Sequence, residues 1–192
     1  MTPLKKDNDL QKAFELIANS SQKEYIRRIA KLVVDNEITK PKIQNILSEF
    51  KIQNIKDIKS ELLDTLIEYA VLVLEDNVLT ENEKTNFHFL KLYFEIKAGD
   101  FYKNKYQKIK MILEKEFEKL YADDLITADE SEYTVILQDM FDLTYDQFDK
   151  LKEDIIRKSI ERGASITDLD TANTKFLRKR NLLKRLLDYI KK

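Results

Sequence analysis

The sequence predicts an all-α fold: a multi-helix bundle of eight or nine helices, assembled from tandem helix–turn–helix units. The 192 residues include only two Gly and two Pro, which leaves almost no turn chemistry for β-hairpins. Apolar residues recur at the i, i+3, i+4 spacing of an amphipathic helix almost from end to end. A short acidic segment also recurs about every 40 residues, a period typical of repeated helical pairs.

The apolar stripes place the helices in order along the chain. The stripes predict helices around residues 10–17, 25–33, 62–74, 87–94, 102–120, 133–140, 148–155 and 183–190. A further helix begins after Thr39, where Pro41 falls in a first turn that does not need its missing N–H. Because the connections are short, we expect a single all-helical domain over residues 1–192.

The recurring acidic segment explains how these helices begin. Its copies are 35–39, 76–80 and 123–127, with a weaker one at 163–167, and each ends in Thr at an expected N-cap. Thr80 with Glu83, and Thr127 with Glu130, are spaced as capping boxes, whereas Thr39 is followed by Lys42 and lacks the acid. The Asp-Asn or Asp-Asp pair tolerates the left-handed geometry that ends the preceding helix.

A second recurring element follows each capped helix. Phe, a charged residue and an aliphatic residue occur in succession at 50–52, 94–96 and 141–143. After the third copy, Thr144 and Gln147 are spaced as another capping box. Each unit is therefore predicted to contain a helix, an acidic turn, a capped helix, an aromatic–aliphatic bend and a further helix.

The third copy resembles a known family. Residues 122–130 (ADDLITADE) and 141–148 (FDLTYDQF) are similar to the TerB-like family of tellurite-resistance proteins, whose members show A-D-G-x-[IV]-[ST]-x-x-E and then F-[GD]-[LI]-[ST]-x-x-x-[FL]. Residues 76–101 resemble a more diverged copy, and this chain has Asn77 and Asp124 where the family usually has Gly. The resemblance implies TerB-like units at approximately 57–118 and 103–163. From its charge and leucine spacing, 164–192 is expected to form a basic amphipathic closing helix.

The resemblance also carries expectations about function. It implies an all-helical bacterial protein of the cytoplasm, linked to tellurite resistance, stress response or phage defence. Members are generally described as scaffolds or cation-binding modules rather than as enzymes. The acidic positions of the family fall here on Asp123, Asp124 and Glu130 in one copy, and on Asp76 and Glu83 in the other.

Carboxylates in the third unit make a divalent cation a candidate ligand. Residues 122–149 contain nine acids and no Lys or Arg, and such a concentration of carboxylates attracts hard cations or a basic partner. An EF-hand is excluded, because its first and third loop positions would be Lys119 and Tyr121. Three interpretations stay open: a weak cation site at Asp123, Asp124 and Glu130, a docking surface, or helix caps on a solvated face.

Positive charge gathers at the carboxyl end. Residues 171–192 carry eight basic residues against Asp188, a net charge of +7, and leucines at helical spacing. Such a segment can bind an anionic membrane or nucleic acid through its basic face. Alternatively, it packs its leucine face against the helical bundle as a terminal helix. The candidate binding residues for a partner or an anionic surface are Lys175, Arg178, Lys179, Arg180, Lys184 and Arg185.

Several function classes lack the residues they need. The chain has no Cys, and its single histidine, His88, is expected to face solvent and excludes two-histidine metal sites. No Gly-rich phosphate loop, signal peptide or apolar stretch of membrane-spanning length is present, and the net charge of −1 argues against a general nucleic-acid surface.

The sequence therefore favours a non-enzymatic cytoplasmic protein that acts by binding a protein partner, with a divalent cation as a candidate cofactor. The alternative is an adaptor that binds an anionic membrane or nucleic acid through its basic carboxyl-terminal helix.

Overall fold

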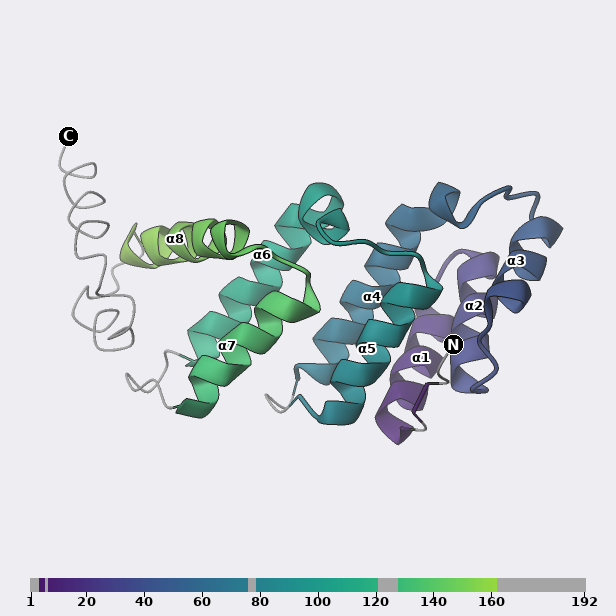
Figure 1. The fold of residues 1–192 in the computed structure, drawn as a ribbon, viewed down its shortest axis with the longest axis horizontal. Coiled ribbons are helices and arrows are strands. Elements are labelled where there is room, and N and C mark those ends of the chain that lie inside the picture. The colour runs from purple at the N-terminus through teal and green to yellow at the C-terminus, as the bar shows by residue number, and fades with distance from the viewer. Residues whose placement is uncertain (1–3, 6, 76–78, 121–127, 162–192) are drawn as a thin grey trace. The chain divides into compact units, whose positions relative to one another are not determined.

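The computed structural model describes residues 4–5, 7–75, 79–120 and 128–161. These residues form eight α-helices and one 3₁₀-helix, with no strand among them, which confirms the all-α prediction (Figure 1). The helices are α1 (Asn8–Ser20), α2 (Glu24–Val34), α3 (Lys40–Glu49), η1 (Ile55–Ile58), α4 (Lys59–Val73), α5 (Glu81–Tyr93), α6 (Asp100–Leu120), α7 (Ala128–Met140) and α8 (Tyr145–Glu161). None of these described helices combines the length and apolar character needed to cross a bilayer.

The chain divides into two compact units. Unit 1 is Met1–Ile109 with Met140–Asp142, and unit 2 is Lys110–Asp139 with Leu143–Lys192. The division falls within α6, which also has a non-helical residue at Lys105, with φ −133° and ψ 25°. The single domain, the unit boundaries near 57–118 and 103–163, and the tandem repeat in three dimensions all stay predictions.

Threonine caps begin the helices as the sequence predicted. The Thr39 hydroxyl accepts a hydrogen bond from the Lys42 amide at 3.3 Å, at the start of α3. At the start of α5, the Thr80 hydroxyl accepts from the Glu83 amide at 3.3 Å, and the Glu83 carboxylate accepts from the Thr80 amide at 2.7 Å. Of these two caps, only the one at Thr80, which has the acid at the third helical position, is a full capping box, as predicted. Thr127 and Thr167 lie outside the described residues.

The cap before α8 is also a full capping box, with Gln147 in the place of the acid. The Gln147 side-chain oxygen accepts from the Thr144 amide at 3.0 Å, and the Thr144 hydroxyl accepts from the Gln147 amide at 3.3 Å. This reciprocal pair confirms the predicted capping box.

The recurring aromatic–aliphatic bend is a Schellman turn. After α3, α5 and α7, a non-glycine residue has left-handed backbone: Lys51 (φ 59°), Glu95 (φ 53°) and Asp142 (φ 50°). In each, the amide of the following aliphatic residue donates to a carbonyl five residues back, at 2.9, 2.9 and 3.0 Å. Asn36 (φ 54°) ends α2 in the same way, as predicted for the acidic turns. The other predicted left-handed positions, in 76–77 and 123–124, lie outside the described residues.

Unit 1 is organised around a run of buried aromatic rings. Phe14 contacts Tyr69 with ring centroids 5.4 Å apart, and Tyr69 stacks on Phe87 at 6.0 Å. Phe101 lies 6.2 Å from Phe87 and 5.5 Å from Phe141, so the run crosses the unit. All five side chains are almost fully buried, and aromatic pairs at these distances contribute about 0.5–1.5 kcal/mol each beyond area burial.

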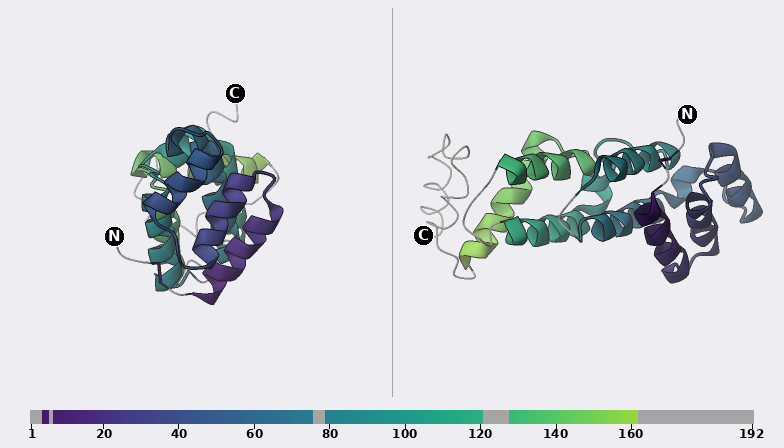
Figure 2. Two further views of the ribbon diagram at one scale, coloured as in Figure 1. Left: turned by 90° about the vertical axis from the view of Figure 1, so that its right-hand side faces the viewer. Right: turned by 90° about the horizontal axis from the view of Figure 1, so that it is seen from below.

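Within unit 1, α1 packs on α2 and α4, α2 packs on α3, and α4 packs on α5 and η1. Figure 2 shows α1 and α2 beside each other in both views. Buried polar residues of this unit, Asn86 and Lys91 among them, bind backbone that is distant in the sequence. Asn86 bonds to Lys5, and Lys91 donates to the Met140 carbonyl at 3.3 Å and the Asp142 carboxylate at 2.8 Å.

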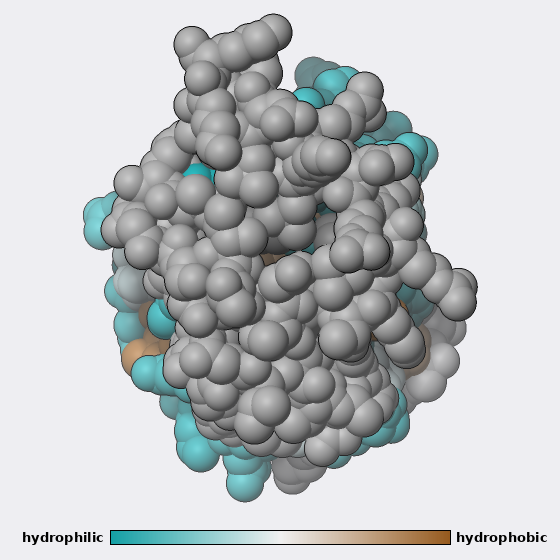
Figure 3. All heavy atoms as spheres, turned by 90° about the vertical axis from the view of Figure 1, so that its left-hand side faces the viewer, coloured by the Kyte–Doolittle hydropathy of each residue, from teal (hydrophilic) through white to brown (hydrophobic). Residues whose placement is uncertain are grey.

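Unit 2 combines an aromatic pair with buried polar contacts. Phe117 and Phe148 lie 5.8 Å apart, and the Lys152 ammonium lies over both rings at 5.7 and 5.2 Å. Burial lowers the pKa of Lys152 and outweighs the nearby Asp149. The Tyr133 hydroxyl donates to the buried Glu116 carboxylate at 2.8 Å. The described residues that are visible at the edge of the face in Figure 3 are mostly hydrophilic, consistent with 36% charged residues.

Candidate functional site: a groove in unit 1

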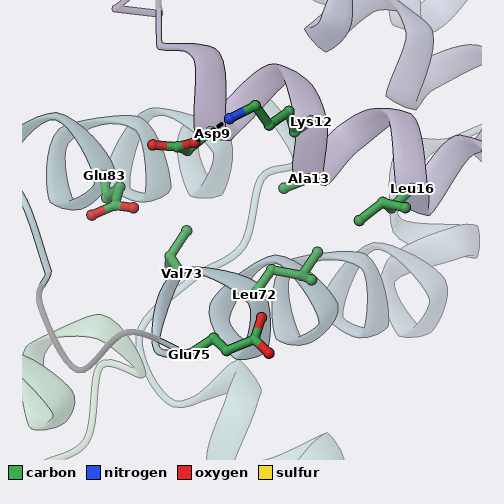
Figure 4. Close-up of a pocket in the computed structure, with 8 residues that line it drawn as sticks. All are labelled: Asp9, Lys12, Ala13, Leu16, Leu72, Val73, Glu75 and Glu83. Carbon is green, nitrogen blue, oxygen red and sulfur yellow. Dashed lines mark hydrogen bonds and ion pairs between the residues drawn. The ribbon is translucent and has the colours of Figure 1, made fainter.

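A hollow in the described part of unit 1 lies between α1, the end of α4 and the start of α5. Its volume is about 490 Å³, within the range of about 300–1,000 Å³ usual for ligand sites. Figure 4 shows the side chains that line it, here called the α1/α4 groove: Asp9, Lys12, Ala13, Leu16, Leu72, Val73, Glu75 and Glu83.

One wall of the groove is a single face of α1. Asp9, Ala13 and Leu16 are spaced i, i+4, i+7, so they lie along one side of the helix. Ala13 is buried against the core, whereas the Leu16 side chain is 57% exposed at the rim. Leu16 is an apolar residue of α1 that lies outside the buried stripe of this helix and is exposed to solvent.

The opposite wall comes from α4 and α5. Leu72 and Val73 end α4, Glu75 follows it, and Glu83 lies in the first turn of α5. Val73 is buried, Leu72 is half-buried and Glu75 is exposed. The groove therefore has an apolar floor and rim residues that reach solvent.

Carboxylates make one end of the groove acidic. Glu83 is only 6% exposed, and one of its oxygens accepts both the amide and the hydroxyl of Thr80 at 2.7 Å. Asp9 pairs with Lys12 at 3.1 Å, but both side chains are largely exposed, so this ion pair is weak. Three carboxylates thus line the groove against one ammonium group.

A buried hydroxyl lies near the same carboxylates. Burial, followed by the charges of Glu83, Asp7 and Asp9, raises the pKa of Tyr69. Its hydroxyl is buried without a hydrogen-bond partner among the described residues. Because both burial and the surrounding carboxylates disfavour its ionised form, Tyr69 stays neutral and adds no further negative charge here.

A contact distant in sequence holds α1 in place over the groove. The Lys5 amide donates to the Asn86 side-chain oxygen at 2.8 Å, and the Asn86 amide group donates to the Lys5 carbonyl at 3.1 Å. Leu4 is buried beside this pair, and Asp7 caps α1 through the Asp9 amide at 2.9 Å. The segment before α1 is thus fixed to α5, which supplies the opposite wall.

A smaller hollow of about 270 Å³ lies elsewhere in unit 1, lined by Lys40, Pro41, Ile43, Gln44, Ile55, Tyr93 and Glu95. Lys40 and Glu95 pair across it at 3.3 Å. Because its two charges neutralise each other, this hollow has no net charge to select a ligand.

Of the predicted metal ligands, the structure places the side chain of Glu83 alone. That carboxylate caps α5 and lines the α1/α4 groove. Asp76, Asp123 and Asp124 lie outside the described residues, and Glu130 belongs to α7 with a side chain that is likewise not described. Within the described residues, no group of three or more His, Asp or Glu side chains could hold a metal ion.

Of the other residues singled out from the sequence, the structure describes some and not others. Lys175, Arg178, Lys179, Arg180, Lys184 and Arg185 all lie outside the described residues. His88 is exposed on α5, as predicted. Sequence reasoning missed the rest of the groove, although Leu16 carried a signal, since it interrupts the polar face of an otherwise well-patterned helix.

Comparison with known proteins adds no relative: no family model, curated protein or solved structure matches this chain. The TerB-like resemblance stays a prediction from residues 76–101 and 122–148.

Proposed function

We propose that this chain is a non-enzymatic protein-interaction module, a TerB-like scaffold of the bacterial cytoplasm that serves in stress response or phage defence. The observation that best supports the binding role is the α1/α4 groove, which joins apolar walls to charged groups at one end. Such a surface buries apolar side chains of a partner and fixes their orientation through a few polar contacts.

A selection from displayed helical peptides tests this proposal. The full chain is the target, and the library varies the exposed positions of a two- to four-turn helix. We expect enriched peptides to bind the wild type and to lose affinity when Leu16 and Leu72 are both replaced by Ser. A Leu92→Ser variant is the matched control, since Leu92 is also exposed (44%) but does not line the groove. Failure to enrich any groove-dependent peptide contradicts the proposal.

The acidic segment 122–149 supports an accessory role for a weakly bound divalent cation at Asp123, Asp124 and Glu130. Calorimetric titration of the full chain with Ca²⁺, Mg²⁺ and Mn²⁺ tests it. Heat that disappears when the three residues become amides is the expected result, and no heat at millimolar metal rejects the cation site.

The second candidate function is an adaptor for anionic membranes or nucleic acid. The net charge of +7 over residues 171–192 supports it. This proposal predicts salt-sensitive co-sedimentation with anionic vesicles, or a mobility shift of DNA or RNA, that is lost when these residues are removed. Binding that does not depend on them rejects this function.

A further inference from the structure

We infer that the α1/α4 groove accepts a basic amphipathic helix of a partner protein, with a Lys or Arg side chain at its acidic end and apolar side chains at its other end. The inference rests on the proposed function and adds the chemical class of the partner. Length, direction and charge of the groove each support it.

The length of the groove suits about two turns of helix. From Asp9 to Leu16 the α1 wall covers seven residue-to-residue steps, or about 10 Å at the α-helical rise of ~1.5 Å per residue. A helix laid into a groove is recognised through side chains at i, i+3, i+4 and i+7, which cover this same distance. The groove therefore has room for one such set of side chains.

The groove also has a direction. In Figure 4, Asp9 and Glu83 lie toward one end and Leu16 lies toward the other, while Leu72 and Glu75 lie on the facing wall between them. An occupant with a uniform apolar face leaves the carboxylate end without a partner. An occupant with a cation followed by apolar residues at helical spacing satisfies both ends at once.

The charge of the groove selects a cationic occupant. Asp9, Glu75 and Glu83 outnumber Lys12, and Glu75 has an exposed carboxylate at the rim. Glu83 is buried, so a cation brought to it is screened less than one at an open surface. The charged head of a Lys or Arg side chain makes charge-assisted hydrogen bonds to carboxylates such as these.

Three labelled helical peptides of about 14 residues test the inference against the full chain by fluorescence anisotropy. They share the same Leu positions and carry Lys, Gln or Glu at every polar position. We expect the Lys peptide to bind most tightly and the Glu peptide least, with the preference for Lys weakening between about 0.05 and 0.5 M salt as the charges are screened.

Variants of the chain locate the binding. Glu75→Gln and Glu83→Gln each weaken the Lys peptide by about two- to fivefold, and Gln at position 83 retains the capping geometry with Thr80. Leu16→Ser weakens all peptides by about tenfold, since roughly half of a Leu side chain is newly buried in the complex. Glu15→Gln and Leu92→Ser are the matched controls, because both residues are exposed outside the groove and are expected to change nothing.

Each result decides between the two proposals. Equal binding of the three peptides, or a Lys peptide that ignores the groove variants, overturns the basic-helix inference. If the displayed library yields groove-dependent peptides without basic residues, the inference fails while the docking function stands. If neither the library nor these peptides bind the groove, both fail.

Discussion

Replacing Asn86 with Ala should release the segment before α1 from α5. Asn86 is fully buried and makes two hydrogen bonds to the backbone of Lys5, at 2.8 and 3.1 Å. These are long-range contacts between residues 81 positions apart. They fix the beginning of α1, the helix that forms one wall of the groove.

The expected cost follows from those two bonds. An intramolecular hydrogen bond contributes a net ~1 kcal/mol, so losing two costs about 2 kcal/mol. The small void left by the amide group adds to this, but the Lys5 backbone can be rehydrated because Lys5 is exposed. A loss of about 2 kcal/mol raises the population of the open segment about 30-fold.

Hydrogen exchange followed by NMR measures that population residue by residue. In Asn86→Ala, the Lys5 amide loses its acceptor and should exchange without protection, and protection in the first turns of α1 should fall by up to about 30-fold. Asn82→Ala is the matched control, because Asn82 is exposed on the same helix. Unchanged protection of Lys5 and α1 in Asn86→Ala would refute the tether.

Three further changes have defined outcomes in urea unfolding followed by circular dichroism. Thr80→Ala should lower the free energy of unfolding by about 1 kcal/mol, because α5 loses its capping box. Lys51→Gly should raise it by about 0.5–1 kcal/mol, because Lys51 has φ 59° and glycine adopts this backbone without strain. Asp64→Asn should reduce stability at pH 7, and this effect should shrink as pH falls below about 4. Burial alone would raise the pKa of Asp64, but hydrogen bonds from Lys105 and Lys108 outweigh it and lower that pKa. The ion pairs therefore stabilise the fold above the unfolded-state pKa of about 4 and are lost as pH falls through the folded-state value.

Controls for these three changes come from the same chain. Thr80→Ser keeps a capping hydroxyl and should retain most of the stability. Lys56→Gly, within η1 and without a positive φ, should destabilise where Lys51→Gly stabilises. A stability difference between Asp64→Asn and wild type that does not change between pH 7 and pH 3 would contradict the role of the two lysines.

The sequence was most informative where structure is local. Thr80 and Glu83 are three residues apart, so their capping box depends on the conformation of a single turn. The apolar stripe of α1 was likewise predicted correctly, since all of its predicted core residues are buried. Caps and apolar stripes of this kind involve residues that are close together in the chain, so their spacing in the sequence is enough to predict them.

The recurring bends were recognised as a pattern without their cause. A Schellman turn usually has glycine at the left-handed position, but this chain has Lys51, Glu95 and Asp142 there. The recurring signal was instead the aliphatic residue that follows, whose amide closes the turn. A rule that searches for glycine fails in a chain that has only two.

Buried polar residues could not be predicted, because their partners are distant in the chain. A lysine is expected at the surface from its charge alone, yet the side chain of Lys91 is buried and binds the Met140 carbonyl and the Asp142 carboxylate. Asn86 was not singled out at all. Neither residue has a neighbour within one helical turn that indicates its role, so only the fold reveals it.

The groove depends on the same contacts that stabilise the fold. Glu83 contributes a carboxylate to its acidic end because the Thr80 cap holds that side chain beneath the rim. The α1 wall stands opposite because Asn86 fixes the segment before it. Since both walls are held by hydrogen bonds made before any partner arrives, little ordering cost remains for binding, and a preorganised groove retains more of its interaction energy as affinity.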